Sequence, residues 1–163
     1  MKKRLTGFAL AALILAADQG SKYWVLHGLH LQKGHILTVL PVLNFVLVWN
    51  QGITFGMFAS FASRIILATI ATAVVIALCI WLWRSKNWLK TLAIGAIAGG
   101  AIGNVVDRLH YGAVVDFLQA HLGGLAFPWV FNVGDSAICC GVAMLMLESL
   151  LQRPPVAAGG RQR

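Results

Sequence analysis

The sequence has few charged residues and almost no acidic ones. Of its 163 residues, 11% are charged and 59% are hydrophobic, and five acidic residues stand against thirteen lysines and arginines. A soluble domain of this length needs roughly a quarter of its residues charged to cover its surface. The composition therefore excludes a cytosolic globular domain and a disordered chain, and it favours a protein whose outer surface faces lipid.

The sequence also lacks the spacings of several common sites. Cys79, Cys139 and Cys140 lie in apolar runs without a CxxC or Cys/His pattern, so we expect them to be reduced and buried. The chain has no HExxH motif and no glycine-rich phosphate loop. Its net charge of +8 does not indicate nucleic acid, because the cations cluster beside apolar runs. We expect no metal, no cofactor and no nucleic-acid partner.

Four apolar stretches are long enough to cross a membrane, since a hydrocarbon core of about 30 Å takes about 20 helical residues. The expected spans are near Leu5–Leu26, Ile65–Trp83, Leu89–Val106 and Val130–Leu151. Helices are expected because lipid cannot satisfy exposed backbone groups. The first stretch could be a cleavable signal peptide, but its pattern continues through Leu26 and three spans follow, which favours a retained anchor. The sequence predicts an all-α membrane protein with one domain, residues 1–153, and a disordered tail, residues 154–163.

The basic residues set the expected orientation. Nine of the thirteen lie near the N-terminus, between the second and third spans, or in the tail: Lys2, Lys3, Arg4, Arg84, Lys86, Lys90, Arg153, Arg161 and Arg163. The positive-inside rule then places both termini in the cytoplasm. On the other side, Ile36–Leu40 and Phe45–Trp49 predict a small β-rich flap on the outer membrane surface. The second outer connection, about His110–Trp129, is glycine-rich and amphipathic, a pattern typical of a segment at the membrane interface.

Four of the five acidic residues fall at one depth. Glu148 lies near the cytoplasmic end, close in sequence to Arg153, and we expect it to be solvated. At about 1.5 Å per residue, the others lie near the outer interface: Asp18, Asp107, Asp116 and Asp135. Carboxylates at that depth are costly unless they are paired, hydrated or protonated.

Local ion pairs explain only half of these aspartates. Asp18 can form an ion pair with Lys22, one helical turn away, and Asp107 can partly be neutralised by its neighbour Arg108. Asp116 and Asp135 have no basic residue within four positions. A functional site is therefore favoured over four separate local pairs.

Polar residues around the acids follow the helical period. Asn104, Asp107 and Arg108 share one face of the third span, and Asn132, Asp135 and Ser136 share one face of the fourth. Consecutive GxxxG spacings at Gly95, Gly99 and Gly103 permit close helix packing beneath this cluster. This arrangement predicts that the third and fourth spans bring Asp116 and Asp135 together.

Two adjacent carboxylates share a proton, so that one can act as a base on water while the other donates to a carbonyl. Serine chemistry is less favoured, because Ser21 and Lys22 point apart on a helix and Ser136 is expected to orient Asp135. The five histidines show no metal-ligand pattern: His27, His30, His35, His110 and His121. The residues alone therefore favour an aspartic peptidase mechanism.

Five ordered sequence boxes run from the first span through the fourth: Asp18–Lys22, Asn50–Gly56 (NxGxxFG), Gly103–Arg108 (GNxxDR), Val114–Phe117 (VVDF) and Phe131–Ser136 (FNxADS). Through these boxes, nearly the whole chain resembles the lipoprotein signal peptidase (signal peptidase II) family. The last box departs from the family pattern, because Gly134 replaces the usual alanine.

The resemblance implies a membrane aspartyl endopeptidase of the bacterial inner membrane, with its active site at the outer face. It implies that Asp116 and Asp135 are catalytic, and that no metal is needed. Supporting residues are then Asp18, Lys22, Asn50, Gly52, Asn104, Asp107, Arg108, Asn132 and Ser136. The expected substrate of the protein is a diacylglyceryl-modified prolipoprotein, cut before the lipidated cysteine. Membrane lipid is the other expected partner, and we expect a monomer.

Two functions without peptidase chemistry remain as alternatives. A small proton- or ion-coupled carrier also uses intramembrane aspartates, but carriers show internal repeats and polar groups near the midplane. A non-catalytic factor that binds lipidated proteins would need no aspartate pair.

Overall fold

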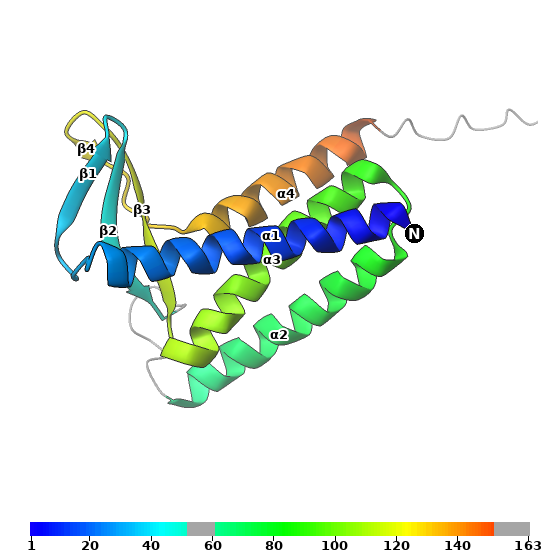
Figure 1. Ribbon diagram of the computed structural model, residues 1–163, viewed down its shortest axis with the longest axis horizontal. Coiled ribbons are helices and arrows are strands. Elements are labelled where there is room, and N and C mark those ends of the chain that lie inside the picture. The colour runs from blue at the N-terminus through cyan, green and yellow to red at the C-terminus, as the bar shows by residue number, and fades with distance from the viewer. Residues whose placement is uncertain (52–60, 152–163) are drawn as a thin grey trace, which may run out of the picture.

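A computed structural model describes residues 1–51 and 61–151, and within them the chain is mostly helical with a small antiparallel sheet (Figure 1). The helices are α1 (Lys2–Tyr23), continued by the π-helical turn η1 (Trp24–Gly28), α2 (Phe61–Arg84), α3 (Trp88–Tyr111) and α4 (Val133–Leu151). The strands are β1 (Ile36–Leu40), β2 (Leu43–Asn50), β3 (Val114–Leu122) and β4 (Leu125–Ala126). Two parts of the chain lie outside the described residues: the second box from Gly52 onward, and the tail at 154–163.

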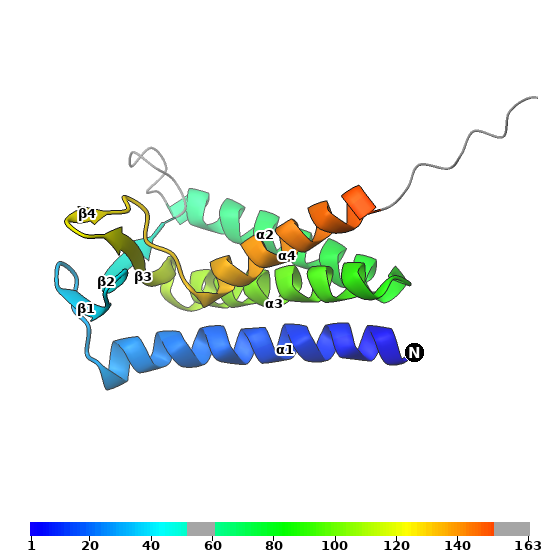
Figure 2. The same cartoon turned by 90° about the horizontal axis from the view of Figure 1, so that it is seen from above.

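The four helices run side by side, and α3 contacts each of the other three. Figure 2 shows α1 on one side of α3, with α2 and α4 on the other. The sheet, in the order β1-β2-β3-β4, lies at the end of the bundle away from the N-terminus (Figure 1). The polar residues discussed below lie where this sheet meets the helices.

Glycines on α3 allow the close approach of α1. A Cβ added at Gly95 would lie 2.5 Å from the carbonyl oxygen of Gly7, and one at Gly99 would lie 2.6 Å from that of Ala11. The predicted GxxxG face therefore packs against α1. The approach of α4 uses a different glycine, Gly100, whose added Cβ would collide with the backbone of Gly134.

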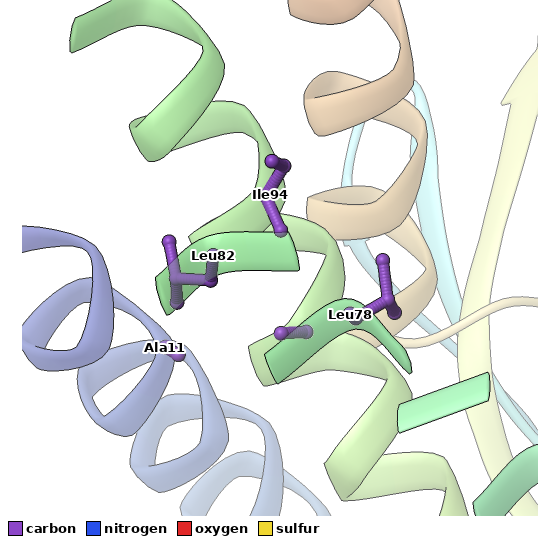
Figure 3. Close-up of a cluster of buried hydrophobic side chains, with 5 residues drawn as sticks. Ala11, Leu78, Leu82 and Ile94 are labelled. Atoms are coloured by element: carbon purple, nitrogen blue, oxygen red, sulfur yellow. The ribbon is translucent and has the colours of Figure 1, made fainter. Parts of the chain in front are cut away.

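Two apolar clusters hold the bundle and the sheet. In Figure 3, Ala11, Leu78, Leu82 and Ile94 gather where α1, α2 and α3 meet. The second cluster joins η1 to the sheet, and its buried members are Val25, Leu31, Leu47, Val115 and Phe117. The sheet is thus fixed to the end of α1 by burial of apolar side chains.

Three of the four predicted spans correspond to helices long and apolar enough to cross a membrane. Among the described residues these are Ile65–Arg84 within α2, the whole of α3 and the whole of α4. The third span extends to Tyr111 rather than Val106, and the fourth begins at Val133 rather than Val130. α1 is not among the three, because it carries charged residues at both ends, so its membrane crossing stays a prediction.

The predicted pairing of Ile36–Leu40 with the strand that follows is confirmed, whereas the structure of the second connection, about His110–Trp129, was only partly anticipated. β1 pairs with β2, and β2 pairs in turn with β3, which lies within the segment expected to be glycine-rich and interfacial. The glycines of this connection lie outside β3: Gly112 (φ 72°) ends α3, and Gly123 (φ 58°) forms the turn after β3. Between them, Val114–Leu122 is rich in β-branched and apolar residues, and this is the strand signal.

Two burial predictions were wrong. Cys139 and Cys140 are free but exposed on the helix surface rather than buried. Glu148 is only 5% exposed rather than solvated, and its carboxylate lies 3.4 Å from Nζ of Lys90. An ion pair therefore connects α3 to α4 at the end of the bundle away from the sheet.

Candidate active site

The start of α4 holds Asp135 through a reciprocal pair of hydrogen bonds. Asn132 precedes the helix, and its Oδ1 accepts from the backbone N–H of Asp135 at 2.8 Å. The backbone N–H of Asn132 donates in return to Oδ2 of Asp135 at 3.2 Å. This is the capping-box arrangement, with aspartate in place of the more usual glutamate. The box satisfies two helix-end N–H groups and fixes the orientation of the Asp135 carboxylate.

The alternation of β3 presents Asp116 to the same place. Val115 and Phe117 point into the apolar cluster beside η1, so the side chain between them points to the opposite face. Asp116 is 1% exposed. Its Oδ2 accepts from Nδ2 of Asn50 at 2.8 Å, and its Oδ1 accepts from Nδ2 of Asn132 at 2.7 Å.

Two asparagine amides connect the carboxylates. Asn132 bonds both Asp116 and Asp135, as described above, and its Nδ2 also donates to Oδ1 of Asn104 at 3.1 Å. Nδ2 of Asn104 donates to Oδ1 of Asp135 at 2.8 Å. Within the described part of the chain, no basic side chain lies within 4.0 Å of either carboxylate. The pair is therefore held by neutral donors.

Burial raises the pKa of Asp116 from 3.8 to about 6. The nearby charge of Asp135 also raises this pKa, whereas the hydrogen bonds from Asn50 and Asn132 and the charge of Lys22 lower it. Desolvation outweighs the donors because the carboxylate is removed from water. Asp116 thus holds a proton to a higher pH than an ordinary aspartate does, and about half of it is protonated near pH 6.

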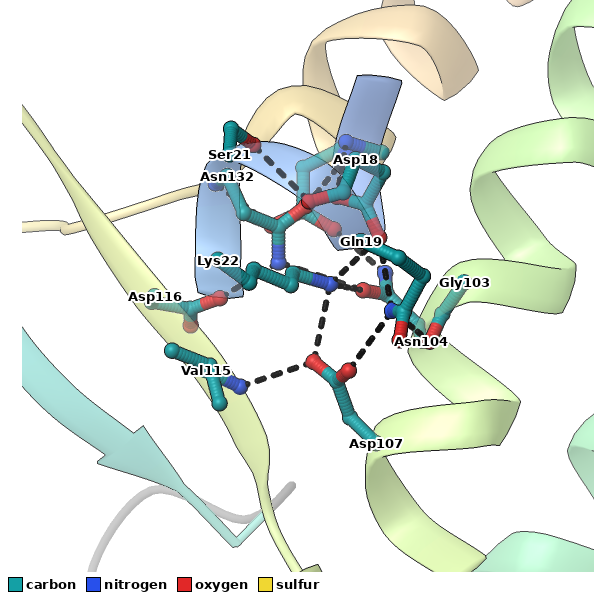
Figure 4. Close-up of polar contacts among 12 residues, drawn as sticks. Asp18, Gln19, Ser21, Lys22, Gly103, Asn104, Asp107, Val115, Asp116 and Asn132 are labelled. Carbon is teal, nitrogen blue, oxygen red and sulfur yellow. Dashed lines mark hydrogen bonds and ion pairs between the residues drawn. The ribbon is translucent and has the colours of Figure 1, made fainter. Parts of the chain in front are cut away.

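A second polar group lies beside this pair and is an ion triad. Nζ of Lys22 lies 2.6 Å from Oδ2 of Asp18 and 2.8 Å from Oδ2 of Asp107 (Figure 4). It also donates to Oδ1 of Asn104 at 3.2 Å, so this buried ammonium contacts two carboxylates and one amide oxygen. The expected pair of Asp18 and Lys22 is confirmed. The expected pairing of Asp107 with Arg108 was wrong, since the cation next to Asp107 comes from α1.

The triad joins four elements of the fold. Oδ1 of Asp18 accepts from the backbone N–H of Gly134 at 2.8 Å, which ties α1 to α4. Oδ2 of Asp107 accepts from the backbone N–H of Val115 at 3.0 Å, which ties α3 to β3. The triad therefore fixes the strand and the helix that carry Asp116 and Asp135.

Sequence reasoning missed one member of this network. Nε2 of Gln19 lies 2.8 Å from Oδ1 of Asp107, and 3.2 Å from both Oδ2 of Asp18 and the carbonyl oxygen of Gly103 (Figure 4). Its position directly after Asp18, at the same buried depth, was the available signal. A neutral donor here supplies both triad carboxylates without adding charge.

Three further candidates lie at the margin of the site. Nη1 of Arg108 donates to the carbonyl oxygen of Asn104 at 3.2 Å, so this half-buried guanidinium lies beside the amide network. Ser136 does not orient Asp135 as expected, because its hydroxyl donates to the carbonyl oxygen of Asn132 at 3.0 Å. Ser21 donates to the carbonyl oxygen of Asp18 at 2.8 Å, and not to Lys22. Among the residues described, no cluster of His, Cys, Asp and Glu has the grouping of a metal site.

Long apolar helices, a sheet at one end of the bundle and carboxylates gathered between them are the features of a membrane protein with a polar site at one end of its helices. A solved bacterial membrane enzyme shares this fold, with a TM-score of 0.78 at 26% identity over 91% of this chain and 94% of that one. A second solved bacterial membrane enzyme gives a TM-score of 0.75 at 27% identity, over 93% of this chain and 94% of its own.

Sequence comparison places the chain more narrowly. The family described as signal peptidase (SPase) II matches residues 10–151. A lipoprotein signal peptidase of Rhodopseudomonas palustris is 42% identical over 157 residues, covering 93% of this chain and 96% of its own. One from Caulobacter vibrioides is 42% identical over 146 residues, covering 88% and 86%. The chain belongs to the signal peptidase II family, as the five boxes indicated, and it is a membrane peptidase.

Proposed function

We propose that this protein is an aspartyl endopeptidase that cleaves the signal peptide from diacylglyceryl-modified prolipoproteins, just before the lipidated cysteine. The family and its lipoprotein signal peptidases support cleavage of prolipoprotein signal peptides. One observation carries the catalytic assignment: the side chain and backbone of Asn132 bond both Asp116 and Asp135. Two carboxylates held this way share one proton and can perform acid–base hydrolysis.

In this mechanism Asp116 carries the proton, in keeping with its raised pKa, and Asp135 is the base. Asp135 takes a proton from water as the water oxygen attacks the carbonyl carbon, and Asp116 gives its proton to the carbonyl oxygen. The tetrahedral diol returns a proton to Asp116 as the carbonyl re-forms. The proton on Asp135 passes to the departing nitrogen as the C–N bond breaks, so the dyad regains its starting state.

The roles of the supporting residues follow from their contacts. Asn50, Asn104 and Asn132 orient the two carboxylates, and Lys22 with Asp18 and Asp107 holds the elements that carry them. We assign contact with the substrate backbone to the half-buried guanidinium of Arg108, which lies beside the amide network. Gly52 belongs to the second family box, and its role is carried over from the resemblance alone.

We further propose that α1 also crosses the membrane, which gives four spans in all. Both termini then lie in the cytoplasm, and the site lies at the outer face of the bacterial inner membrane. α1 lies along α3, and its first turn meets the basic link between α2 and α3, where Lys3 donates to the carbonyl oxygen of Lys86 (Figure 2). The diacylglyceryl chains can then stay in the bilayer, which positions the scissile bond. On this proposal the protein is a monomer with one membrane domain, residues 1–153, and no metal.

The test is cleavage of a diacylglyceryl-modified precursor by the purified protein in detergent with a chelator present. Asp116→Asn and Asp135→Asn should each lower kcat by about 10²–10⁴-fold. Glu148→Gln, an acid-to-amide change at the other end of the bundle, should leave kcat unchanged. Wild-type cleavage by either aspartate variant would remove the dyad, and loss of activity in chelator would point to a metal. Proton uptake into liposomes without cleavage would instead favour the carrier.

A further inference from the structure

A cavity lies at the end of the bundle opposite the sheet, where the first turn of α1 meets the turn between α2 and α3. Its volume is about 470 Å³. It is lined by Met1, Lys2, Lys3, Arg4, Ser85 and Lys86. Four of these side chains are cationic and none is acidic, and the first turn of α1 contains no acid. We refer to these lining residues as the basic cavity.

The acids of this chain are all engaged elsewhere. Asp18 and Asp107 pair with Lys22, Glu148 pairs with Lys90, and the other two form the proposed dyad. Across residues 1–51 and 61–151, no carboxylate lies within 4.0 Å of a cation of the basic cavity. Adjacent like charges repel one another, so an anion from outside the chain would stabilise the cavity.

Two of the four cations of the cavity, Lys3 and Arg4, are held in place by neutral contacts. Nζ of Lys3 donates to the carbonyl oxygen of Lys86 at 3.2 Å and lies 5.7 Å from the ring centre of Trp88. The guanidinium of Arg4 lies 5.4 Å from the ring centre of Trp83. These contacts orient the charged groups while leaving their charge uncompensated.

The turn that carries Lys86 is also ordered. The hydroxyl of Thr91 donates to the carbonyl oxygen of Asn87 at 2.6 Å, so the 2.8 Å bond between Ser85 and Thr91 uses the hydrogen of Ser85. Oδ1 of Asn87 caps α3 by accepting from the backbone N–H of Lys90 at 3.2 Å. Because the only hydroxyl in the lining has its hydrogen committed, the cavity can recognise a ligand through its cations and not through a hydroxyl donor.

We propose that the basic cavity binds the phosphate of an anionic phospholipid headgroup. Basic pockets between membrane helices on the cytoplasmic side suit such headgroups. Trp83 and Trp88 are 61% and 47% exposed beside the cavity, as expected for aromatic side chains at the headgroup level. The apolar surface of α2 next to it, including Ile80 and Trp81, is also exposed and offers a path for the acyl chains. A lipid therefore fits both surfaces, whereas free phosphate would use only the cavity.

The experiment is native mass spectrometry of the full-length protein in a neutral detergent, titrated with phosphatidylglycerol, with phosphatidylcholine of the same chains, or with inorganic phosphate. One phosphatidylglycerol should bind saturably, and the other two should bind at least tenfold more weakly. Lys86→Glu changes two charge units at about 1 kcal/mol each, and so should weaken binding about thirtyfold.

Two charge reversals serve as controls for Lys86→Glu. Arg84→Glu makes the same change at the same end of the bundle but outside the cavity lining, and Lys33→Glu makes it in the segment before β1, beside the sheet. Both should bind phosphatidylglycerol within about threefold of the wild type, and all three variants should keep the melting temperature measured without lipid. Equal weakening by Arg84→Glu and Lys86→Glu would show a diffuse field instead of a site. Equal binding of both lipids, or binding of phosphate but not lipid, would also overturn the proposal.

Discussion

Replacement of Asn132 separates its role in capping α4 from its role in holding the carboxylates. This side chain is fully buried and has three hydrogen-bond partners, namely the N–H of Asp135, Oδ1 of Asp116 and Oδ1 of Asn104. Asn132→Ala removes all three bonds. Asn132→Ser keeps a good N-cap oxygen but removes both Nδ2 donors.

The expected losses of stability follow from these contacts. An N-cap is worth about 1 kcal/mol, and each buried acceptor left without its donor costs about 1–3 kcal/mol. Oδ1 of Asp116 loses its donor, whereas Oδ1 of Asn104 keeps the one from Lys22. Asn132→Ala should therefore lower the free energy of unfolding by about 3 kcal/mol, and Asn132→Ser by about 1 kcal/mol less. The order of melting temperatures in detergent should be wild type, then serine, then alanine.

The pH dependence gives a second and independent measurement. The hydrogen bond from Asn132 lowers the pKa of Asp116, so both variants should raise it above its present value of about 6. If activity needs protonated Asp116, kcat/KM of the wild type should decline as the pH rises through about 6. In both variants this decline should move to higher pH, at a reduced maximum rate.

Asn87→Ala is the matched control, because Asn87 caps α3 at the opposite end and contacts neither carboxylate. It should cost about 1 kcal/mol of stability without moving the pH profile. Equal stability of the Asn132 serine and alanine variants would refute the capping role. An unmoved or acid-shifted profile would refute the assignment of the proton to Asp116.

Two further substitutions test the triad. Lys22→Met should cost about 3–5 kcal/mol, because it leaves Asp18 and Asp107 buried without their cation, and added Asp18→Asn should restore part of the melting temperature. No gain from Asp18→Asn would contradict this account of charge. Gly103→Ala should sharply lower the yield of folded protein, since an added Cβ collides with the Asp18 carboxylate. A Cβ at Gly20 meets nothing within 4 Å, so Gly20→Ala should raise the free energy of unfolding by about 0.5–1 kcal/mol. Equal melting temperatures for these two glycine variants would show that Gly103 is not tightly packed.

The sequence allowed prediction of those features that depend on helical spacing. The depth of the aspartates along the spans and the pair of Asp18 with Lys22 follow from rise and period alone. The asparagine and aspartate of the α4 capping box also stand three residues apart, so their shared helix face was visible. Three of the four predicted spans are long apolar helices for the same reason.

Contacts between elements distant in sequence could not be predicted in this way. Asn50 reaches Asp116 only because β2 pairs with β3, and that pairing was not anticipated. The cation beside Asp107 comes from α1, whereas sequence proximity favoured Arg108. The same limit applies to Gln19, whose donors serve acids on two helices. Helical period identifies a face, but it does not identify the helix or strand that the face meets.

The division of the four aspartates has a physical consequence for the proposed mechanism. A cation within about 4–6 Å of a carboxylate favours its charged form, and would oppose the sharing of a proton by two acids. Lys22 is the buried cation nearest the site, and its ammonium contacts Asp18, Asp107 and the amide oxygen of Asn104. The two acids of the triad therefore hold the ammonium away from the dyad, and Asn104 transmits only a neutral hydrogen bond to Asp135. The charge of Lys22 still lowers the pKa of Asp116, but burial raises it by more, so the triad fixes the fold without preventing Asp116 from holding a proton.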